Sequence, residues 1–256
     1  MIIGDERMKK IYIFILLLTG MSQLVFASRK DDADKAYQEN NFVKAIELYQ
    51  SVLSVEGESA AIYYNLGNSY YKSDSIAKAI LNYERALILA PNDDEISFNL
   101  EMAKSKTIDK ITPKSEIFIV SWFNSLTALM NESGWAQFAI FSFIILLLGL
   151  AAYIFSKKVA VKKIGFTIAV VCFIFTIFAN IFAQSQKDTL IIRNTAIVME
   201  PTVTVRSTPN ESGTELFVLH EGSKVLILDD TMNSWKEISL EDGNRGWIQT
   251  EMIEVI

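Results

Sequence analysis

The chain has 256 residues, of which 50% are hydrophobic and 21% are charged, and its formal net charge is −6. Charged residues are absent from 135–155 and again from 164–183, and each run is long enough to cross a hydrocarbon core, which needs about 20 apolar residues. The flanking regions are acidic: 29–110 carries 10 basic and 14 acidic residues, and 187–256 carries 6 basic and 12 acidic residues. This composition excludes a purely soluble enzyme and argues against a nucleic acid partner.

Residues 1–27 have the composition of an export signal. Basic residues at the start precede the apolar stretch 11–18, and Val-Phe-Ala at 25–27 fits the small-residue pattern of a signal peptidase site. We therefore expect a signal peptide at 1–27, with Ser28 as the new N-terminus. An uncleaved anchor is the alternative, and both interpretations place the following residues outside the cytoplasm.

The next region contains a repeat with a period of 34 residues, in which Ala45 and Tyr49 recur as Ala79 and Tyr83. The second copy is the more complete. Its expected repeat-packing residues are Tyr63, Leu66, Gly67, Tyr70, Ala79, Tyr83, Ala86 and Pro91. They lie at helical spacings on two successive helices, which Gly67 and Ala79 allow to approach closely and the second of which ends at Pro91. The pattern resembles the tetratricopeptide repeat, and this resemblance implies an all-α helical stack over 28–112.

A capping helix is expected after the second repeat. Residues 96–104 repeat the Asn-Leu step of the second copy, but Glu101 and Lys104 stand where that copy has glycine and tyrosine. Because these charges cannot be buried in a further repeat, we expect the helix to close the stack with a polar outer face. The acidic residues at 93–95 are favourable at the start of this helix.

A partner-binding groove is expected on the first helices of the stack. The residues one step from the packing face of the second repeat are Tyr64, Asn65, Asn68, Tyr71 and Lys72. Their rings and amides can bind an extended peptide or a helix. In the alternative interpretation, Tyr64 and Tyr71 only cover neighbouring helices.

Residues 117–130 are uncharged but too short to cross a membrane, which takes at least about 17 residues. Apolar residues at helical spacing share one face, so we expect an interfacial amphipathic helix with Trp122 and Trp135 at headgroup depth. The alternative is a buried helix that packs on the preceding domain.

A two-helix transmembrane hairpin is expected from 135–155 and 164–183. The connecting loop, 156–163, contains four lysines and no acidic residue, which predicts that it lies in the cytoplasm. The lipid bilayer is therefore an expected partner, and both acidic regions are expected on the outer side. Polar side chains within the spans, at Gln137, Thr176 and Asn180, are candidates for hydrogen bonds within the hairpin or with another protein's spans.

Residues 196–256 consist of short alternating apolar runs separated by turn signals, a pattern typical of a small all-β barrel. The order of Val205-Arg206-Ser207, Leu219-His220-Glu221-Gly222, Val225-Leu226-Ile227, Trp235 and Gly246-Trp247-Ile248 resembles the bacterial SH3-like domain. An oligonucleotide-binding barrel is the structural alternative, but the negative charge of this region opposes its usual ligand.

Trp235 and Trp247 are the candidate ligand platform of this domain, and the alternative is that both belong to its core. We favour the core for Trp247, which leaves Trp235 as the possible ligand platform, and we expect a structural role for His220. The lone thiol of Cys172 and the lone imidazole of His220 are separated by a membrane boundary, which excludes a Cys-His pair within one chain. We expect no catalytic residues, no metal site, no cofactor and no enzymatic activity.

The complete order of parts resembles the BatE proteins of aerotolerance operons. That resemblance implies an inner-membrane protein with its repeat and SH3-like domains in the periplasm, and partners with von Willebrand A-type domains. The first hypothesis is a non-enzymatic scaffold within a stress-tolerance complex. The second is an envelope protein that binds peptidoglycan peptides through the SH3-like domain, and an enzyme with an unrecognised site is the third.

Overall fold

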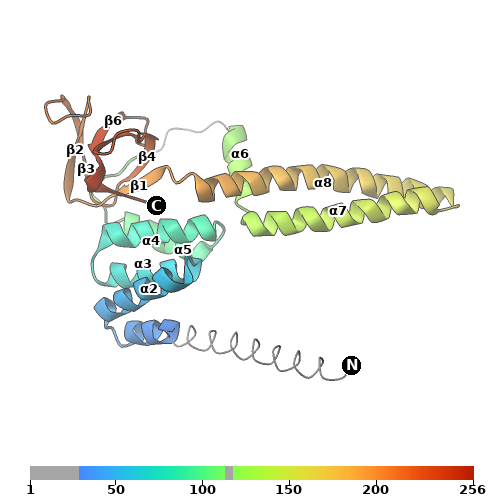
Figure 1. Ribbon diagram of the computed structural model, residues 1–256, viewed down its shortest axis with the longest axis horizontal. Coiled ribbons are helices and arrows are strands. Elements are labelled where there is room, and N and C mark those ends of the chain that lie inside the picture. Colours follow the sequence, from blue (N-terminus) through green and yellow to red (C-terminus); the bar gives the residue numbers. More distant parts are fainter. Residues whose placement is uncertain (1–28, 113–117) are drawn as a thin grey trace, which may run out of the picture.

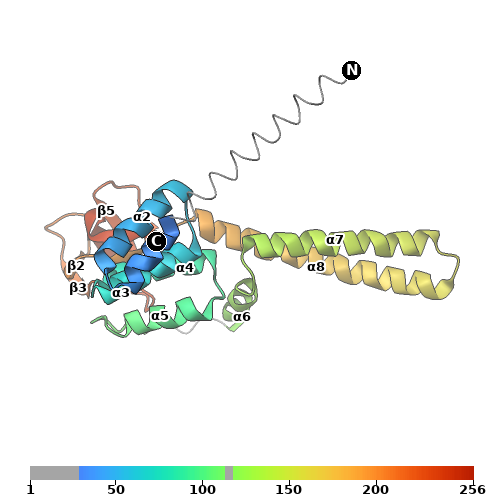
Figure 2. The ribbon, with the colours of Figure 1, turned by 90° about the horizontal axis from the view of Figure 1, so that it is seen from below.

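The computed structural model describes residues 29–112 and 118–256, so the expected signal peptide at 1–27 lies outside the described residues. Three parts follow one another along the chain: a helical stack, a helical hairpin and an antiparallel sheet (Figure 1). The hairpin extends away from the other two parts, as a view from below also shows (Figure 2).

The helical stack is built of antiparallel neighbours joined by short turns. Its helices are residues 29–38, α2 (Phe42–Glu56), α3 (Ala60–Lys72), α4 (Ile76–Leu89) and α5 (Asp94–Lys104). Asn40 and Asp74 turn the chain with positive φ angles of 58° and 59°, a conformation that short polar residues tolerate. Asp93 begins α5 by accepting hydrogen bonds from the backbone N–H groups of Glu95 and Ile96.

The predicted repeat-packing residues form the interior of this stack. Of the eight, only Pro91, which follows α4, is not buried. Gly67 on α3 faces Tyr83 on α4, and a Cβ atom at position 67 would lie 2.7 Å from two atoms of the Tyr83 ring. The glycine is therefore required because the ring fills the space that any larger residue would occupy.

The outer face of α5 differs from the expected polar cap. Glu101 is exposed there, but so are Phe98 (67% exposed) and Met102 (39% exposed), one helical turn apart. The outer face of α5 is therefore mixed, whereas the polar face that we expected was drawn from Glu101 and Lys104 alone.

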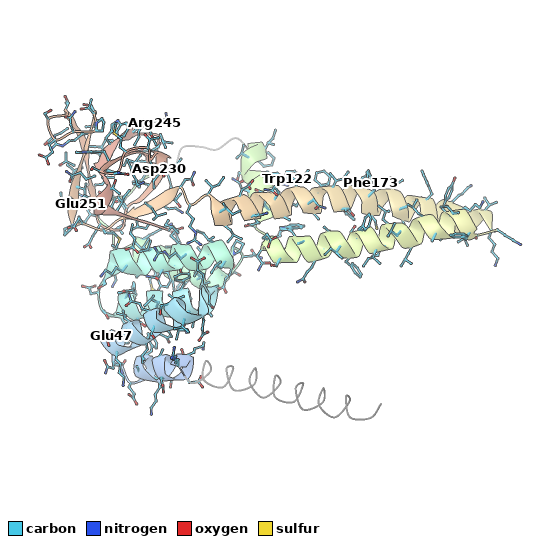
Figure 3. The ribbon with its side chains drawn as sticks, viewed as in Figure 1. Glu47, Trp122, Phe173, Asp230, Arg245 and Glu251 are labelled. Atoms are coloured by element: carbon cyan, nitrogen blue, oxygen red, sulfur yellow. The ribbon has the colours of Figure 1, made fainter. Side chains whose placement is uncertain are left out.

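The hairpin consists of α7 (Glu132–Phe155) and α8 (Val159–Ile191), both long and apolar enough to cross a membrane. Its apolar side chains point outward along most of its length, as Phe173 illustrates (Figure 3). At 24 and 33 residues, α7 and α8 are longer than the predicted spans. The expected loop at 156–163 is correspondingly shorter, because α8 already begins at Val159.

Small residues bring the two helices of the hairpin together. A Cβ atom at Gly149 would lie 2.8 Å from the Gly165 carbonyl oxygen, and one at Gly165 would lie 2.7 Å from the Gly149 carbonyl oxygen. The Ser142 hydroxyl of α7 donates to the Cys172 carbonyl oxygen of α8 (3.0 Å). Close backbone packing of this kind stabilises helix pairs in membranes.

Helix α6 (Phe118–Thr127) lies against the base of the hairpin (Figure 1). Its Phe123 ring packs edge-on against Phe182 of α8, at 5.5 Å between centroids, while Trp122 points outward and is 57% exposed (Figure 3). The alternative expectation was a buried helix that packs on the preceding domain. The structure differs, because α6 packs on the hairpin. Trp135 is buried within the protein, and its indole N–H donates to the Thr127 carbonyl oxygen.

The C-terminal region forms one antiparallel sheet. Its strands are β1 (Thr195–Val198), β2 (Thr202–Arg206), β3 (Glu215–His220), β4 (Lys224–Asp229), β5 (Trp235–Ser239), β6 (Arg245–Gln249) and β7 (Ile253–Val255). They pair in the order β3-β2-β6-β5-β4-β1-β7. Within the described residues no pairing joins β3 to β7, so the sheet is open and differs from a closed barrel.

Replacing Gly67 with alanine tests the packing of the stack. The added methyl group overlaps the Tyr83 ring, which outweighs a gain in helix propensity of about 1 kcal/mol. We expect a net loss of about 1–2 kcal/mol in the free energy of unfolding, measured by urea titration in detergent with circular dichroism at 222 nm. The control Ser51→Ala, at an exposed position of α2, should change stability little. An increase in stability for Gly67→Ala would contradict the proposed packing.

Candidate partner-binding face

Hydrogen bonds between polar side chains connect the first helices of the successive helix pairs, which are residues 29–38, α3 and α5. Asn65 donates to Asp34 (3.4 Å), and Asn99 donates to both Asn68 (3.1 Å) and the Tyr64 hydroxyl (2.8 Å). We call Asp34, Tyr64, Asn65, Asn68 and Asn99 the amide ladder. Each member is only partly buried, so the ladder reaches the surface of the face that these helices form.

The five predicted partner-binding residues have different environments. Tyr64, Asn65 and Asn68 belong to the amide ladder, and the Tyr71 ring lies beneath the Lys106 ammonium at 4.2 Å. Lys72 is exposed. Both tyrosines therefore contact the following segment of the stack, as the alternative interpretation expected, yet they remain half-buried and accessible from one side.

Sequence reasoning missed Asn99 as a member of this face, although a signal was present. Asn99 follows Asn65 by the 34-residue period and lies in the same Asn-Leu step. Asp34 and Glu95 were also missed. Asp34 accepts from the Tyr49 hydroxyl (2.6 Å), and Glu95 accepts from the Tyr64 hydroxyl (2.7 Å), across helices whose pairing no local pattern indicates.

The phenols of this region are neutral hydrogen-bond donors. Burial, together with the hydrogen bond to Glu95, raises the pKa of Tyr64 to about 12. Burial likewise raises the pKa of Tyr49 and Tyr83 well above the usual value for tyrosine. These hydroxyl groups stay protonated near neutral pH, so the face presents fixed donors and acceptors for binding and no activated nucleophile.

The sheet covers the opposite side of the second repeat. Ile197 of β1 and the C-terminal Ile256 are buried in the same hydrophobic cluster as Ile80 and Tyr83 of α4. Arg85 of α4 donates to the carboxylate of Glu254 (3.0 Å) and to the carbonyl oxygen of the next residue. Stack and sheet thus share part of one core.

A buried carboxylate crosses this interface. Glu84 of α4 is almost fully buried, with Lys224 Nζ of β4 at 2.7 Å and Lys104 Nζ of α5 at 3.1 Å. Burial disfavours the charged form, but the two ammonium groups outweigh it and hold the pKa of Glu84 below its usual value. Removing the Glu84 carboxylate would leave two partly buried ammonium groups without a counterion, and removing both lysines would leave the carboxylate buried and unpaired.

Two further polar contacts connect the parts at the ends of the interface. Asp109 accepts from the backbone N–H of His220 (2.7 Å) and the Ser223 hydroxyl (2.6 Å), and its other oxygen lies 2.8 Å from His220 Nδ1. His220 is therefore placed in a structural contact. Arg193, just after α8, forms a two-pronged ion pair with Glu58, which precedes α3.

The sheet carries a second candidate surface around Trp235. Two adjacent shallow cavities of about 350 and 440 Å³ share Trp235 and Gln249 in their walls. Trp247 is half-buried and lies outside the core, which contradicts our expectation; its neighbour Ile248 is fully buried instead. Strand alternation places Trp247 on the outer face because Gly246 and Ile248 face inward. Across 29–112 and 118–256, no three His, Cys, Asp or Glu side chains are grouped as a metal ion requires.

Comparison with known proteins identifies the stack. A tetratricopeptide repeat model matches residues 60–93, and a second TPR repeat model matches residues 33–74. Residues 33–93 therefore carry tetratricopeptide repeats. No curated protein matches the chain. Tetratricopeptide stacks bind other proteins, so the first-helix face is the candidate site for a protein partner.

Acidification and Glu84→Gln test the interface between stack and sheet. The pKa values of Glu84 and Asp109 are lowered in the folded chain, so their contribution to stability is complete above the ordinary values of 4.5 and 3.8. That contribution declines as the pH falls through the lowered pKa values. We therefore expect the urea concentration at the unfolding midpoint to decrease over this pH range. At neutral pH, Glu84→Gln should cost about 2–3 kcal/mol, because two partly exposed lysines lose their counterion.

Urea titrations followed by tryptophan fluorescence, at neutral and acidic pH, measure both effects. The exposed Glu47→Gln is the matched control and should behave like the wild type. Equal stability of the Glu84→Gln and Glu47→Gln chains at neutral pH would show that the buried carboxylate does not hold the interface.

Proposed function

We propose that this chain is a non-enzymatic scaffold that a transmembrane hairpin anchors and that binds protein partners through the first-helix face of its repeats. One observation carries the proposal: the sheet packs on α4, the second helix of the second repeat, and leaves the amide ladder accessible on the other side. The ladder supplies side-chain donors and acceptors at the regular spacing of the helices, which suits an extended peptide or a helix of a partner.

The membrane placement rests on the hairpin and on charge. The two helices are apolar over enough residues to cross a bilayer, and their outward side chains are almost all hydrophobic. Lysines 157, 158, 162 and 163 lie at the tip, which favours a cytoplasmic tip and periplasmic repeat and sheet regions. The exposed apolar side chains of α6 at the hairpin base, among them Trp122, suit the membrane–water interface.

The finer assignment follows from the order of the parts. Repeats, an amphipathic helix, an apolar hairpin and a C-terminal all-β region with an SH3-like sequence pattern stand in the order that BatE proteins have, and we infer membership of an aerotolerance complex in the bacterial inner membrane. Partners with von Willebrand A-type domains follow from that resemblance.

The alternative function is binding of cell-wall peptides by the sheet. The cavities that share Trp235 favour it, since an aromatic side chain beside Arg206 and Glu211 offers apolar and charged contacts for a short peptide. The two functions use different surfaces of the chain, so one set of variants separates them.

A photo-crosslinking residue at Lys72 tests the partner-binding face. Lys72 is exposed at the end of α3, one helical turn after Asn68 of the amide ladder. Glu47, which Figure 3 labels, is exposed on α2 and serves as the control position. We expect a discrete cross-linked protein from position 72 in intact membranes and none from position 47. Asn65→Ala should reduce the yield about fivefold, which corresponds to the loss of about one hydrogen bond of 1 kcal/mol.

Equal cross-linking from both positions, or none from position 72, would refute partner binding at this face. Saturable binding of soluble muropeptides to the full chain, lost in Trp235→Ala, would instead support the cell-wall function.

Protease accessibility tests the orientation. We expect external protease added to spheroplasts to degrade the repeat and sheet regions, while an epitope inserted at 156–158 stays protected until the membrane is opened. Immunoblotting of both regions gives the measurement. Protection of either region in intact spheroplasts would place it in the cytosol and refute the proposed orientation.

A further inference from the structure

The outer half of the hairpin carries a groove of about 590 Å³ between α7 and α8. It is lined by α7 from Glu132 to Phe143 and by α8 from Thr176 to Lys187. We call it the hairpin groove. Alanines at positions 136, 139 and 183 line it, so another helix can approach both walls closely.

The α8 wall of the hairpin groove is polar where the surrounding surface is hydrophobic. Asn180 is exposed, and its amide donates only to the carbonyl oxygen of Thr176 on its own helix (2.8 Å). Within the described part of the chain, no group donates to the Asn180 side-chain oxygen. The hydrogen bond that does join the two helices comes from Ser142, so the hairpin is closed without Asn180.

A polar amide facing lipid is unfavourable because hydrocarbon offers it no hydrogen-bond partner. Polar residues in membrane spans accordingly face the interior of a helix bundle. Asn180 lies near the outer end of the uncharged run 164–183, and its free side-chain oxygen can accept a hydrogen bond from a helix that enters the hairpin groove.

The outer end of the groove carries opposite charges on its two walls. Glu132 lies on α7 and Lys187 on α8, and neither forms an ion pair within 29–112 and 118–256. A helix that enters the groove and carries a lysine at this level would find Glu132 opposite to it. Helix α8 itself is such a helix.

We propose that the hairpin groove binds α8 of a second copy of this chain, forming a two-fold symmetric dimer in the membrane. This inference rests on the proposed membrane placement. In an isologous contact each surface meets its own copy, so the Asn180 amides pair across the axis, one donating and one accepting. The same symmetry brings Glu132 of each copy to Lys187 of the other, twice per dimer.

Disulfide cross-linking tests the contact in full-length chains in native membranes. In a Cys172→Ala background, which removes the native thiol, we compare Ala183→Cys in the groove with Ser185→Cys, a small residue outside it at similar depth. We expect an oxidant to produce at least a fivefold greater dimer yield for Ala183→Cys. Equal yields would overturn the proposed interface.

Exchange of charge between two copies tests the symmetry. Chains with Glu132→Lys and chains with Lys187→Glu repel their own kind at both contacts, whereas a mixed dimer restores both opposite-charge contacts. Each restored contact should strengthen association about two- to fivefold. Co-purification of differently tagged chains should therefore recover the mixed pair in preference to either identical pair, and equal recovery would overturn the arrangement.

Asn180→Leu tests the amide pairing, with Gln137→Leu as the matched control on an exposed position of α7 outside the groove. We expect dimer dissociation constants in nanodiscs to rise about 3- to 30-fold for Asn180→Leu and to change little for Gln137→Leu. Carbonate extraction of the same membranes separates the two proposals. Chains that do not insert refute the membrane anchor, whereas inserted chains that stay monomeric, or that cross-link from position 183 only to a different protein, overturn the dimer alone.

Discussion

The shared core between the helical stack and the sheet determines how the other parts are arranged. The side chains of Ile197 and Ile256 pack among residues of α4. Beside this contact, Glu84 forms ion pairs with Lys224 of the sheet and Lys104 of the stack. Burying these isoleucines provides the apolar contact, whereas the charged triad tolerates only one arrangement of its partners. The sheet therefore has a fixed position on the repeats.

This fixed position also limits where the hairpin can lie. Helix α8 continues past the predicted span to Ile191 and leads within a few residues into β1, whose Ile197 belongs to the shared core. Arg193 in this short connection is bound to Glu58 of the stack. At about 1.5 Å per residue, the 33-residue α8 is about 50 Å long, some 20 Å longer than a hydrocarbon core. The helix is thus long enough to cross a bilayer and still lead directly into the stack and the sheet.

The sequence predicted what depends on local periodicity and missed what depends on long-range contact. The 34-residue period and the helical spacing predicted that Gly67 lies where two helices approach closely, and the period contained the information for Asn99 as well. No local pattern, however, relates Glu84 to Lys224, which are 140 positions apart and meet only because the sheet folds back on α4. Residues of this kind look like ordinary surface charges in a sequence.

The predicted ends of the spans differ from the ends of the helices for a related reason. An uncharged run marks the part of a helix that suits lipid, but Lys187 and Asp188 do not end α8, since a helix continues through charged residues in water. The position of Trp247 was misjudged because the aromatic residue was assigned to the core before the inward side of β6 had been fixed by Gly246 and Ile248. Closure of the sheet likewise depends on a contact between its edge strands, which alternation within single strands does not determine.

The short connection between α8 and β1 has a consequence for binding. A flexible linker between an anchor and a binding domain spreads the domain over a large volume. In the proposed membrane placement, by contrast, α8 leads almost directly into the folded unit and holds the amide ladder at one height above the membrane. Only partners whose recognition segments lie at that height gain from the confinement. The position of the ladder then adds to the specificity for a partner that its hydrogen bonds provide, since each hydrogen bond is weak. In the proposed placement the architecture therefore favours partners that are themselves anchored in the same membrane.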